Sequence, residues 1–131
     1  NRENGFIDTI KKEFPDIKIV DEQYGMATVE TALQTTEDML TKNTELDGLY
    51  ACNASTAVGA LQALQSQGRT EQIKMVGFDA EEALVNGLKS GAIDSLVVQN
   101  PYKMGYEGVK AVIARLDGKE VPKHIDTGVE R

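Results

Sequence analysis

The stretch IKMVGFDAEEALVNGLKSG, residues 73–91, decides the fold class of this chain. It begins with a short apolar run typical of a buried strand and continues as a helix-forming run that Gly91 ends. Asp79 stands where the expected strand ends and the expected helix begins. A carboxylate at that point can cap the helix, bind a metal ion, act as a catalytic acid or hold a polar ligand. The rest of the sequence decides between these roles.

The same strand-then-helix unit recurs along the chain. Periodicity predicts strands at 17–20 (IKIV), 46–52 (LDGLYAC), 73–78 and 93–98, with one more possible near 124–127. It predicts helices at 6–14, 29–42, 57–67, 80–90 and 101–116. Regular alternation with short turns is typical of parallel βαβ units. The expected fold is therefore α/β: a doubly wound, mostly parallel sheet flanked by helices, with flavodoxin-like topology.

The order of the elements suggests that a strand is missing. The chain begins with a helix, whereas doubly wound domains normally begin with a strand. In a sheet of order 2-1-3-4-5 the first strand lies between the strands expected at 17–20 and 46–52. We expect upstream residues, strand exchange or dimerisation with a partner chain, or a strand rearrangement to fill that place. The start at Asn1, without a signal peptide, indicates a mature segment or a fragment.

Composition sets broad limits on the function. With 131 residues, 40% hydrophobic and 27% charged, the chain is expected to form one globular domain over residues 1–131. A net charge of −7 with scattered basic residues argues against binding to nucleic acid or to anionic lipid. The single cysteine, Cys52, cannot form an internal disulfide, so it does not indicate the compartment.

Polar side chains follow three of the predicted strands. Asn53 comes after LYAC, Asp79 after the strand at 73–78, and Gln99 after LVV. In open parallel sheets, ligands bind beyond the carboxyl ends of the strands, so these side chains are expected at one edge. Amide and carboxylate groups offer donors and acceptors that suit a neutral, polyhydroxylated ligand.

Each of these side chains also has a purely structural interpretation. The alternatives are a capping box formed by Asp79 and Glu82, a helix cap at Asn53 or Ser55, and a turn before a proline at Gln99 and Asn100. Capping and ligand binding are compatible, because one carboxylate has two oxygens. The recurrence of polar residues at neighbouring strand ends favours a ligand site.

Catalytic machinery is not visible in the sequence. The only histidine, His124, lies in the C-terminal tail, away from the predicted strand ends. Cys52 ends an apolar strand and is expected to be a small buried residue rather than a nucleophile. Asp79, Glu81 and Glu82 do not suit a metal ion, because two of the three would lie on the helix surface. Without a glycine-rich nucleotide motif either, we expect no enzyme, no metal and no cofactor.

Four motifs together resemble the C-terminal lobe of ribose-type periplasmic sugar-binding proteins. They are RENGF at 2–6, LDGLYACNASTAVGALQAL at 46–64, MVGFDAEE at 75–82 and VVQNPYKMGYEGVKAV at 97–112. That family shares its two-lobed type I periplasmic binding fold with the ligand domains of lac-repressor-type regulators. The resemblance runs nearly from end to end and implies that the chain is one lobe, with its N-terminal lobe absent.

The resemblance implies a set of ligand contacts. By position, Arg2, Asn53, Asp79 and Gln99 would contact the ligand, and Phe78 would pack near it. In this family the sugar lies between two lobes that close about a hinge. One lobe alone would therefore hold half a site and bind weakly or not at all.

Two positions depart from the family pattern. Many members place an acidic residue after the strand-end asparagine, where this chain has Ala54. Many also carry an aromatic residue in the loop after the IKIV-type strand, close to Ala27, with Met26 and Tyr24 as possible substitutes here. These differences leave a sugar, a sugar derivative, a cyclitol or a signalling furanose as candidate ligands.

The resemblance implies a transport role. The chain would belong to the solute-binding component of an ABC importer, with its own N-terminal lobe and the membrane permease as partners. Its place would be periplasmic, or extracellular and membrane-anchored. The alternatives are the effector domain of a lac-repressor-type regulator or an extracytoplasmic sensor. An alternative of another class is a small flavodoxin-like enzyme or a phosphoacceptor domain that uses Asp79.

Overall fold

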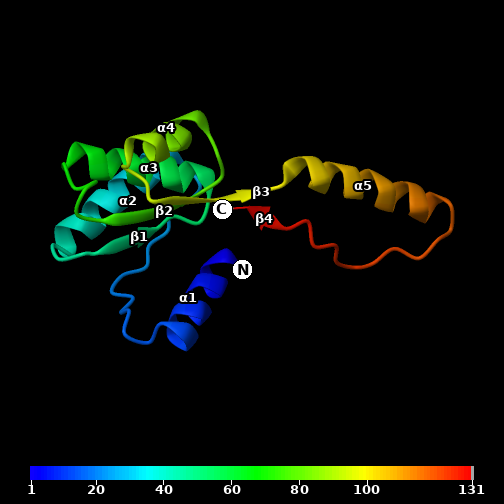
Figure 1. Ribbon diagram of the computed structural model, residues 1–131, viewed down its shortest axis with the longest axis horizontal. Helices are drawn as coiled ribbons and strands as arrows, with labels where there is room; N and C mark the ends of the chain where they lie inside the picture. Colours follow the sequence, from blue (N-terminus) through cyan, green and yellow to red (C-terminus); the bar gives the residue numbers. More distant parts are fainter. Residues whose placement is uncertain (131) are drawn as a thin grey trace. The chain divides into compact units, whose positions relative to one another are not determined.

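The computed structural model describes residues 1–130 and divides the chain into two compact units, residues 1–96 and residues from 97 onward. The first unit contains α1 (Arg2–Glu13), α2 (Val29–Lys42), β1 (Gly48–Tyr50), α3 (Ala54–Ser66), β2 (Lys74–Phe78), α4 (Glu82–Ser90) and the start of β3 (Ser95–Gln99). The second contains the end of β3, α5 (Pro101–Leu116) and β4 (Val129–Glu130) (Figure 1).

The strands form one sheet of order β1-β2-β3-β4. β1 and β2 are parallel, with Gly48 opposite Lys74 and Tyr50 opposite Val76. β4 pairs antiparallel with β3, so that Gln99 lies opposite Val129. The predicted α/β class with a mostly parallel, helix-flanked sheet is confirmed.

Helices α2, α3 and α4 cover one face of the β1–β2 pair (Figure 1). The largest fully buried side chains of this layer are Leu40, Leu64, Ile73, Met75, Leu84 and Ile93. Helix α3 approaches the sheet closely: a Cβ on Gly77 would lie 3.4 Å from Cβ of Ala57. The core of the first unit therefore lies between this helical layer and the sheet.

Helix α1 packs on the opposite face. Tyr50 pairs with Val76, one residue before Gly77, so its side chain turns away from α3. The Phe6 ring of α1 stacks on the Tyr50 ring, with 4.6 Å between centroids and 14° between planes. This aromatic pair fastens the N-terminal helix to β1.

Several element ends follow the sequence signals, but the predicted capping box is wrong. Helix α5 spans the predicted residues, and Gly91 ends α4 at φ 80° as expected. Helix α4, however, begins at Glu82 with Glu81 as its N-cap, and Glu81 makes no side-chain capping bond. Asp79 lies two residues earlier and adopts φ 71°, whereas an N-cap residue takes the β region. The left-handed backbone at Asp79 therefore delays the start of the helix.

The predicted strand at 17–20 is also wrong. This segment forms no strand, and its apolar side chains Ile17, Ile19 and Val20 are exposed. A strand needs a hydrogen-bonded neighbour. Among residues 1–130, β1 pairs only with β2, so residues 17–20 have no strand partner in the sheet. The strand considered near 124–127 is likewise absent, since β4 lies at Val129–Glu130.

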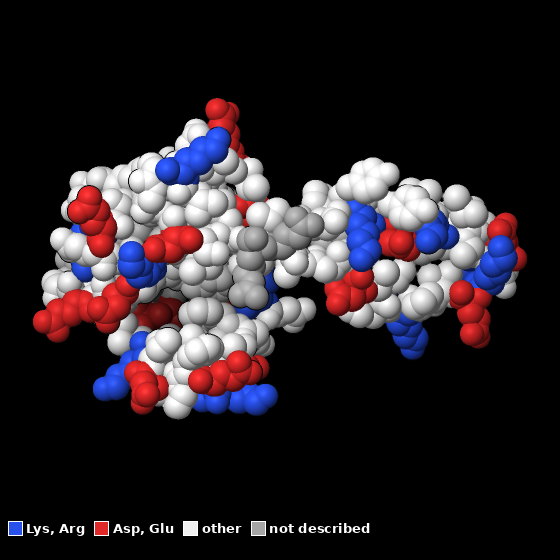
Figure 2. Space-filling model, in the orientation of Figure 1, with Lys and Arg blue, Asp and Glu red and all other residues white. Residues whose placement is uncertain are grey.

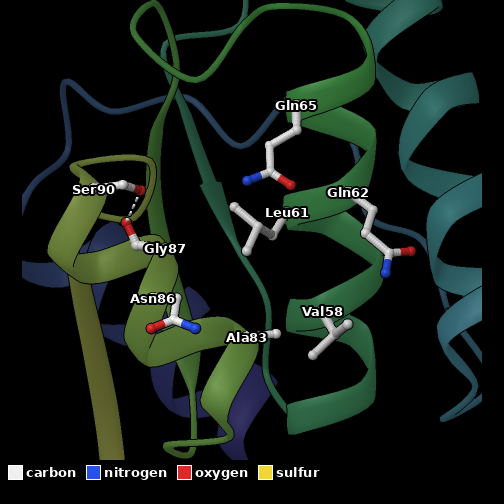
Figure 3. A pocket seen from close by; sticks show the side chains of 8 residues that line it. All are labelled: Val58, Leu61, Gln62, Gln65, Ala83, Asn86, Gly87 and Ser90. Atoms are coloured by element: carbon white, nitrogen blue, oxygen red, sulfur yellow. Dashed lines mark hydrogen bonds between the residues drawn. The ribbon is translucent and has the colours of Figure 1, made fainter.

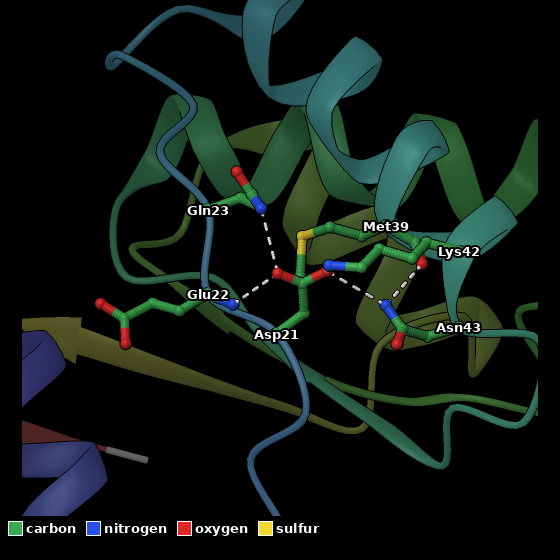
Figure 4. Close-up of polar contacts among 6 residues, drawn as sticks. All are labelled: Asp21, Glu22, Gln23, Met39, Lys42 and Asn43. Carbon is green, nitrogen blue, oxygen red and sulfur yellow. Dashed lines mark hydrogen bonds and ion pairs between the residues drawn. The ribbon is translucent and has the colours of Figure 1, made fainter.

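A carboxylate network fixes the loop that follows this segment. Asp21 accepts hydrogen bonds from Lys42 Nζ at 3.0 Å, Gln23 Nε2 at 3.0 Å, Asn43 Nδ2 at 3.2 Å and the Glu22 backbone N–H at 2.9 Å (Figure 4). Its side chain is only 6% exposed. These donors, Lys42 foremost, lower the pKa of Asp21 from 3.8 to about 2. The network ties the loop to the C-terminal end of α2.

The contact between α2 and α3 predicts the effect of one substitution. A Cβ on Gly59 would lie 2.5 Å from the Val29 carbonyl oxygen and 2.7 Å from Ala32 Cβ. Gly59→Ala is expected to cost at least about 2 kcal/mol of unfolding free energy, although alanine favours helix. Urea unfolding measures this loss of unfolding free energy. The control is Gly5→Ala in α1. Nothing lies within 4 Å of a Cβ built at Gly5, so this variant should raise the unfolding free energy by up to about 1 kcal/mol. A Gly59→Ala variant as stable as the parent would contradict the close packing.

The Asp21 network predicts a pH dependence. Because the folded-state pKa of Asp21 is lowered, its contribution to stability is present above about pH 4 and is lost as pH falls toward about 2. Asp21→Asn should lower the melting temperature at about pH 7, and the difference from the parent should shrink below about pH 4. Asp8→Asn, at an exposed position of α1, is the control. A difference that stays constant from neutral to acid pH would show that the carboxylate charge is not involved.

Candidate functional site

Asn53 stands at the carboxyl end of β1 and at the start of α3. Its side-chain oxygen Oδ1 accepts hydrogen bonds from the Thr56 backbone N–H at 2.9 Å and from Ser55 Oγ at 3.0 Å. The predicted helix cap at Asn53 is therefore confirmed. The cap uses only the oxygen, and the amide nitrogen Nδ2 makes no hydrogen bond within residues 1–130. Its two N–H groups can donate to a ligand.

Arg2 reaches the same edge from the first turn of α1. Its Nη1 donates to the Cys52 carbonyl oxygen at 3.0 Å, at the end of β1. Its guanidinium carbon lies 3.9 Å from the centroid of the Phe78 ring, at the end of β2. A guanidinium stacked on an aromatic face and fixed by a carbonyl has few rotamers left. Helix α1 thus places an ordered cation across two strand ends.

Asp79 follows Phe78 directly and is half-buried. It is one of the few non-glycine residues with positive φ, a conformation that aspartate tolerates better than most side chains. Because β1 and β2 are parallel neighbours, the chain segments after them lie at one edge of the sheet. The structure therefore brings together four predicted residues: Arg2, Asn53, Phe78 and Asp79.

Gln99 belongs to the second unit. It is the last residue of β3, as expected, and lies opposite Val129 of β4. The next residue, Asn100, caps α5, because its Oδ1 accepts a hydrogen bond from the Lys103 backbone N–H at 2.9 Å. The role of Gln99 in the ligand site stays a prediction.

The loop expected to contact the ligand is held beside α1. The Tyr24 hydroxyl lies 3.1 Å from a Glu3 carboxylate oxygen and 3.2 Å from a Glu22 carboxylate oxygen. The hydrogen bond to Glu3 raises the pKa of Tyr24 above its usual value. Glu3 also raises the pKa of Glu22. Met26 and Ala27 follow in this loop, and both are exposed.

Two contributors to the site are not apparent from the sequence. One is the backbone carbonyl of Cys52, which holds Arg2; Cys52 itself is half-buried rather than buried. The other is Gly25, a buried glycine of the loop, where a Cβ would lie 3.2 Å from Thr56 Oγ1. A glycine just before the predicted helix at 29–42 is the only signal that could have identified it.

A separate groove lies between α3 and α4 (Figure 3). It has a volume of about 380 Å³ and is lined by Val58, Leu61, Gln62, Gln65, Ala83, Asn86, Gly87 and Ser90. None of these is a predicted site residue, and the Ser90 hydroxyl donates to the Gly87 carbonyl at 3.0 Å. The groove belongs to the sides of the two helices and does not form part of the candidate site.

Other kinds of site are marked by clustered charge, by grouped metal ligands or by a long apolar helix. On the face shown in Figure 2, acidic and basic side chains are interspersed. Within residues 1–130, no group of three or more His, Cys, Asp or Glu side chains is arranged to hold a metal ion. None of the helices in this part of the chain has the length and apolar character needed to cross a bilayer.

Curated relatives resemble the chain over most of its length. It is 32% identical over 128 residues to the D-ribose/D-allose-binding protein of Pseudomonas aeruginosa, covering 98% of this chain and 39% of that protein. It is 30% identical over 122 residues to the D-allose-binding periplasmic protein of Escherichia coli, and this match covers 92% of this chain and 39% of that protein. The chain thus spans about two fifths of the length of these relatives.

The fold of the chain is similar to that of a solved structure. An ABC transporter solute-binding protein from Agrobacterium vitis, with bound D-fucose, matches with a TM-score of 0.90 and 36% identity, covering 98% of this chain and 44% of that chain. The family described as "Periplasmic binding protein domain" matches residues 1–120. The chain belongs to the periplasmic binding protein domain family.

Proposed function

We propose that this chain is part of the solute-binding component of an ABC importer and binds a monosaccharide or a similar polyhydroxylated ligand. The observation that carries the proposal is the placement of Arg2 between the Cys52 carbonyl and the Phe78 ring, at the strand ends that also carry Asn53 and Asp79. These groups offer a charged donor, amide donors, a carboxylate acceptor and an aromatic surface.

The chemistry of the four side chains complements a sugar. The Asp79 carboxylate accepts hydrogen bonds from ligand hydroxyls, and such charge-assisted bonds are stronger than neutral ones. The amide nitrogen of Asn53 and the guanidinium of Arg2 donate to hydroxyl or ring oxygens. Because the helix cap and the Phe78 ring already order Asn53 and Arg2, binding loses little side-chain entropy.

The relatives support a sugar as the ligand class. Those compared above are named for D-ribose and D-allose or carry bound D-fucose, at 30% to 36% identity. In our proposal this role is periplasmic, with a membrane permease as the partner that receives the ligand.

Helix α5 supports a second lobe as a further partner. Its apolar residues recur at alternating spacings of four and three, and each is more than half exposed: Tyr102, Tyr106, Val109, Ile113 and Leu116. A groove of about 580 Å³ runs along this face, and α5 contains no buried residue. An amphipathic helix is stabilised mainly by covering such a face. In our proposal the N-terminal lobe, outside this sequence, covers it, and closure of the lobes about a hinge buries the ligand.

The proposed function predicts sugar binding by the ligand site in the gene's full-length product. Calorimetric titration with D-ribose and D-allose should show binding, and Asp79→Asn should cost at least about 2 kcal/mol of affinity, roughly 30-fold. Asparagine tolerates the left-handed backbone at this position, so the variant tests the charge rather than the fold. Glu82→Gln, on an exposed position of α4, is the control. Sugar affinity unchanged in Asp79→Asn would remove Asp79 from the site, and no response to a broad sugar panel would refute the function.

The proposed function also predicts how a charge on the apolar face of α5 affects stability. Val109→Asp should leave the melting temperature of the 131-residue chain nearly unchanged, because Val109 is exposed in it. In the full-length product the same change should cost at least about 2 kcal/mol, since it buries a charge against the second lobe. Lys103→Asp, also on α5, serves as the charge control. Equal effects in both proteins would show that no further lobe covers this face.

A further inference from the structure

The N-terminal helix brings a residue of the candidate site and an aromatic residue to one of its faces. Arg2 and Phe6 of α1 are four positions apart, so their side chains lie one above the other on the same side of the helix. The Phe6 ring stacks on the Tyr50 ring, with 4.6 Å between centroids. One turn earlier in α1, Arg2 Nη1 donates to the Cys52 carbonyl oxygen at 3.0 Å. The same face of α1 thus makes both contacts.

The partners of this face are close together on one extended segment. Tyr50 ends β1 and Cys52 follows two residues later, and between them the Ala51 backbone N–H still donates to the Val76 carbonyl at 2.9 Å. Four residues of helix advance about 6 Å, and two residues of extended chain advance about 6.6 Å. Because these two lengths match, the aromatic stack and the Arg2 hydrogen bond form together at one register of α1 on β1. A slip of one helical residue would move the Arg2 backbone by about 1.5 Å, half the length of that hydrogen bond.

Helix α1 lies at the surface, so its position depends on individual contacts rather than on burial in the core. Each residue of α1 remains at least partly exposed. The Tyr24 hydroxyl donates to the Glu3 carboxylate at 3.1 Å, but this hydrogen bond is exposed and competes with water. The Phe6 and Tyr50 rings lie 14° from parallel, and stacked rings have a defined geometry. The stack is therefore the contact best suited to fix the register of α1.

Arg2 depends on this helix in a way that the other residues of the candidate site do not. Asn53, Phe78 and Asp79 follow strands, so the pairing of β1 with β2 places them. The Arg2 guanidinium lies 3.9 Å from the centroid of the Phe78 ring, at the end of a long side chain that starts from α1. Such a side chain has many rotamers, and its anchors select one of them only while its backbone stays in place. A shift of α1 would disorder Arg2 and leave the sheet unchanged.

We propose that the Phe6–Tyr50 stack is a positioning element of the sugar site, which holds α1 in the register that places the Arg2 guanidinium at the strand ends. The inference rests on the proposed function. Phe6 and Tyr50 act through Arg2 and do not contact the ligand themselves. Removing the Phe6 ring would lower sugar affinity because Arg2 would have to be ordered again at each binding event.

The test uses the full-length product with D-ribose and D-allose as probes. Calorimetry gives the affinities of the parent, Phe6→Ala, Arg2→Gln and the double variant. Phe6→Ala should weaken binding at least about fivefold, and Arg2→Gln at least about tenfold. In the Arg2→Gln background, Phe6→Ala should cost less than about twofold more, because the guanidinium that the stack positions is already gone.

Two further variants and a spectroscopic signal separate positioning from general stability. Phe6→Tyr restores a stacking ring and should bind like the parent. Phe14→Ala, which removes the exposed ring just after α1, is the matched control and should also bind like the parent. Without sugar, the Nε resonance of Arg2 in the parent should differ from that of free arginine, and in Phe6→Ala it should move toward the free value. Thermal unfolding of each variant shows that the fold is retained.

The outcomes separate this inference from the function on which it rests. If Phe6→Ala binds as the parent does while Asp79→Asn loses affinity, the positioning role is refuted and the sugar site stands. Equal losses from Phe6→Ala with and without Arg2 would show that the ring does not act through Arg2. An Arg2 Nε resonance unchanged by Phe6→Ala would overturn the inference even where affinity falls. If the parent binds neither probe, the proposed sugar function fails and the positioning role fails with it.

Discussion

The parallel pairing of β1 with β2 is the constraint on which the candidate site depends. The register that sets Tyr50 opposite Val76 makes both strands end at one edge of the sheet. Asn53 and Asp79, 26 positions apart in the sequence, follow those two ends. Helix α1 then adds Arg2, held by the Cys52 carbonyl and the Phe78 ring. Any change that shifted this register would separate the groups that the proposed ligand must meet.

The structural roles seen at this edge are compatible with the proposed binding role, because polar side chains such as Asn53 have more than one polar atom. The Asn53 oxygen caps α3, and its amide nitrogen is left for a ligand. The backbone at Asp79 illustrates a different relation: its positive φ delays the start of α4, so the carboxylate is not the N-cap of that helix. Met26 and Ala27, in the loop before α2, also have positive φ, of 51° and 57°, and they follow Gly25, where a Cβ would lie 2.8 Å from Ala32 Cβ. Fold stability thus supports local conformations that are unfavourable by themselves.

Elements with a strong local sequence signal were predictable, strands β2 and β3 among them, whereas features that depend on one specific distant partner were not. Pro101 and the apolar periodicity that follows it predicted α5 over its observed span, and Gly91 predicted the end of α4. The strand expected at 17–20 fails because a strand depends on its neighbour and not on its own β-branched residues. The candidate site of the first unit was proposed from the polar strand ends and the family resemblance, and its role in binding stays a prediction. The Cys52 carbonyl contact and the positive φ of Met26 and Ala27 were not predicted, because a backbone acceptor and a backbone dihedral leave no mark in side-chain chemistry.

The central claim is that a sugar meets the edge formed by Asn53, Phe78 and Asp79, and its most direct test is residue-specific NMR of the full-length product. On titration with D-allose, the account predicts that the Asn53 side-chain amide and the Arg2 guanidinium resonances shift together and saturate at one affinity. Resonances of Gln62 and Asn86, in the groove between α3 and α4, should stay unchanged. Shifts confined to that groove, with Asn53 and Arg2 unmoved, would contradict the account.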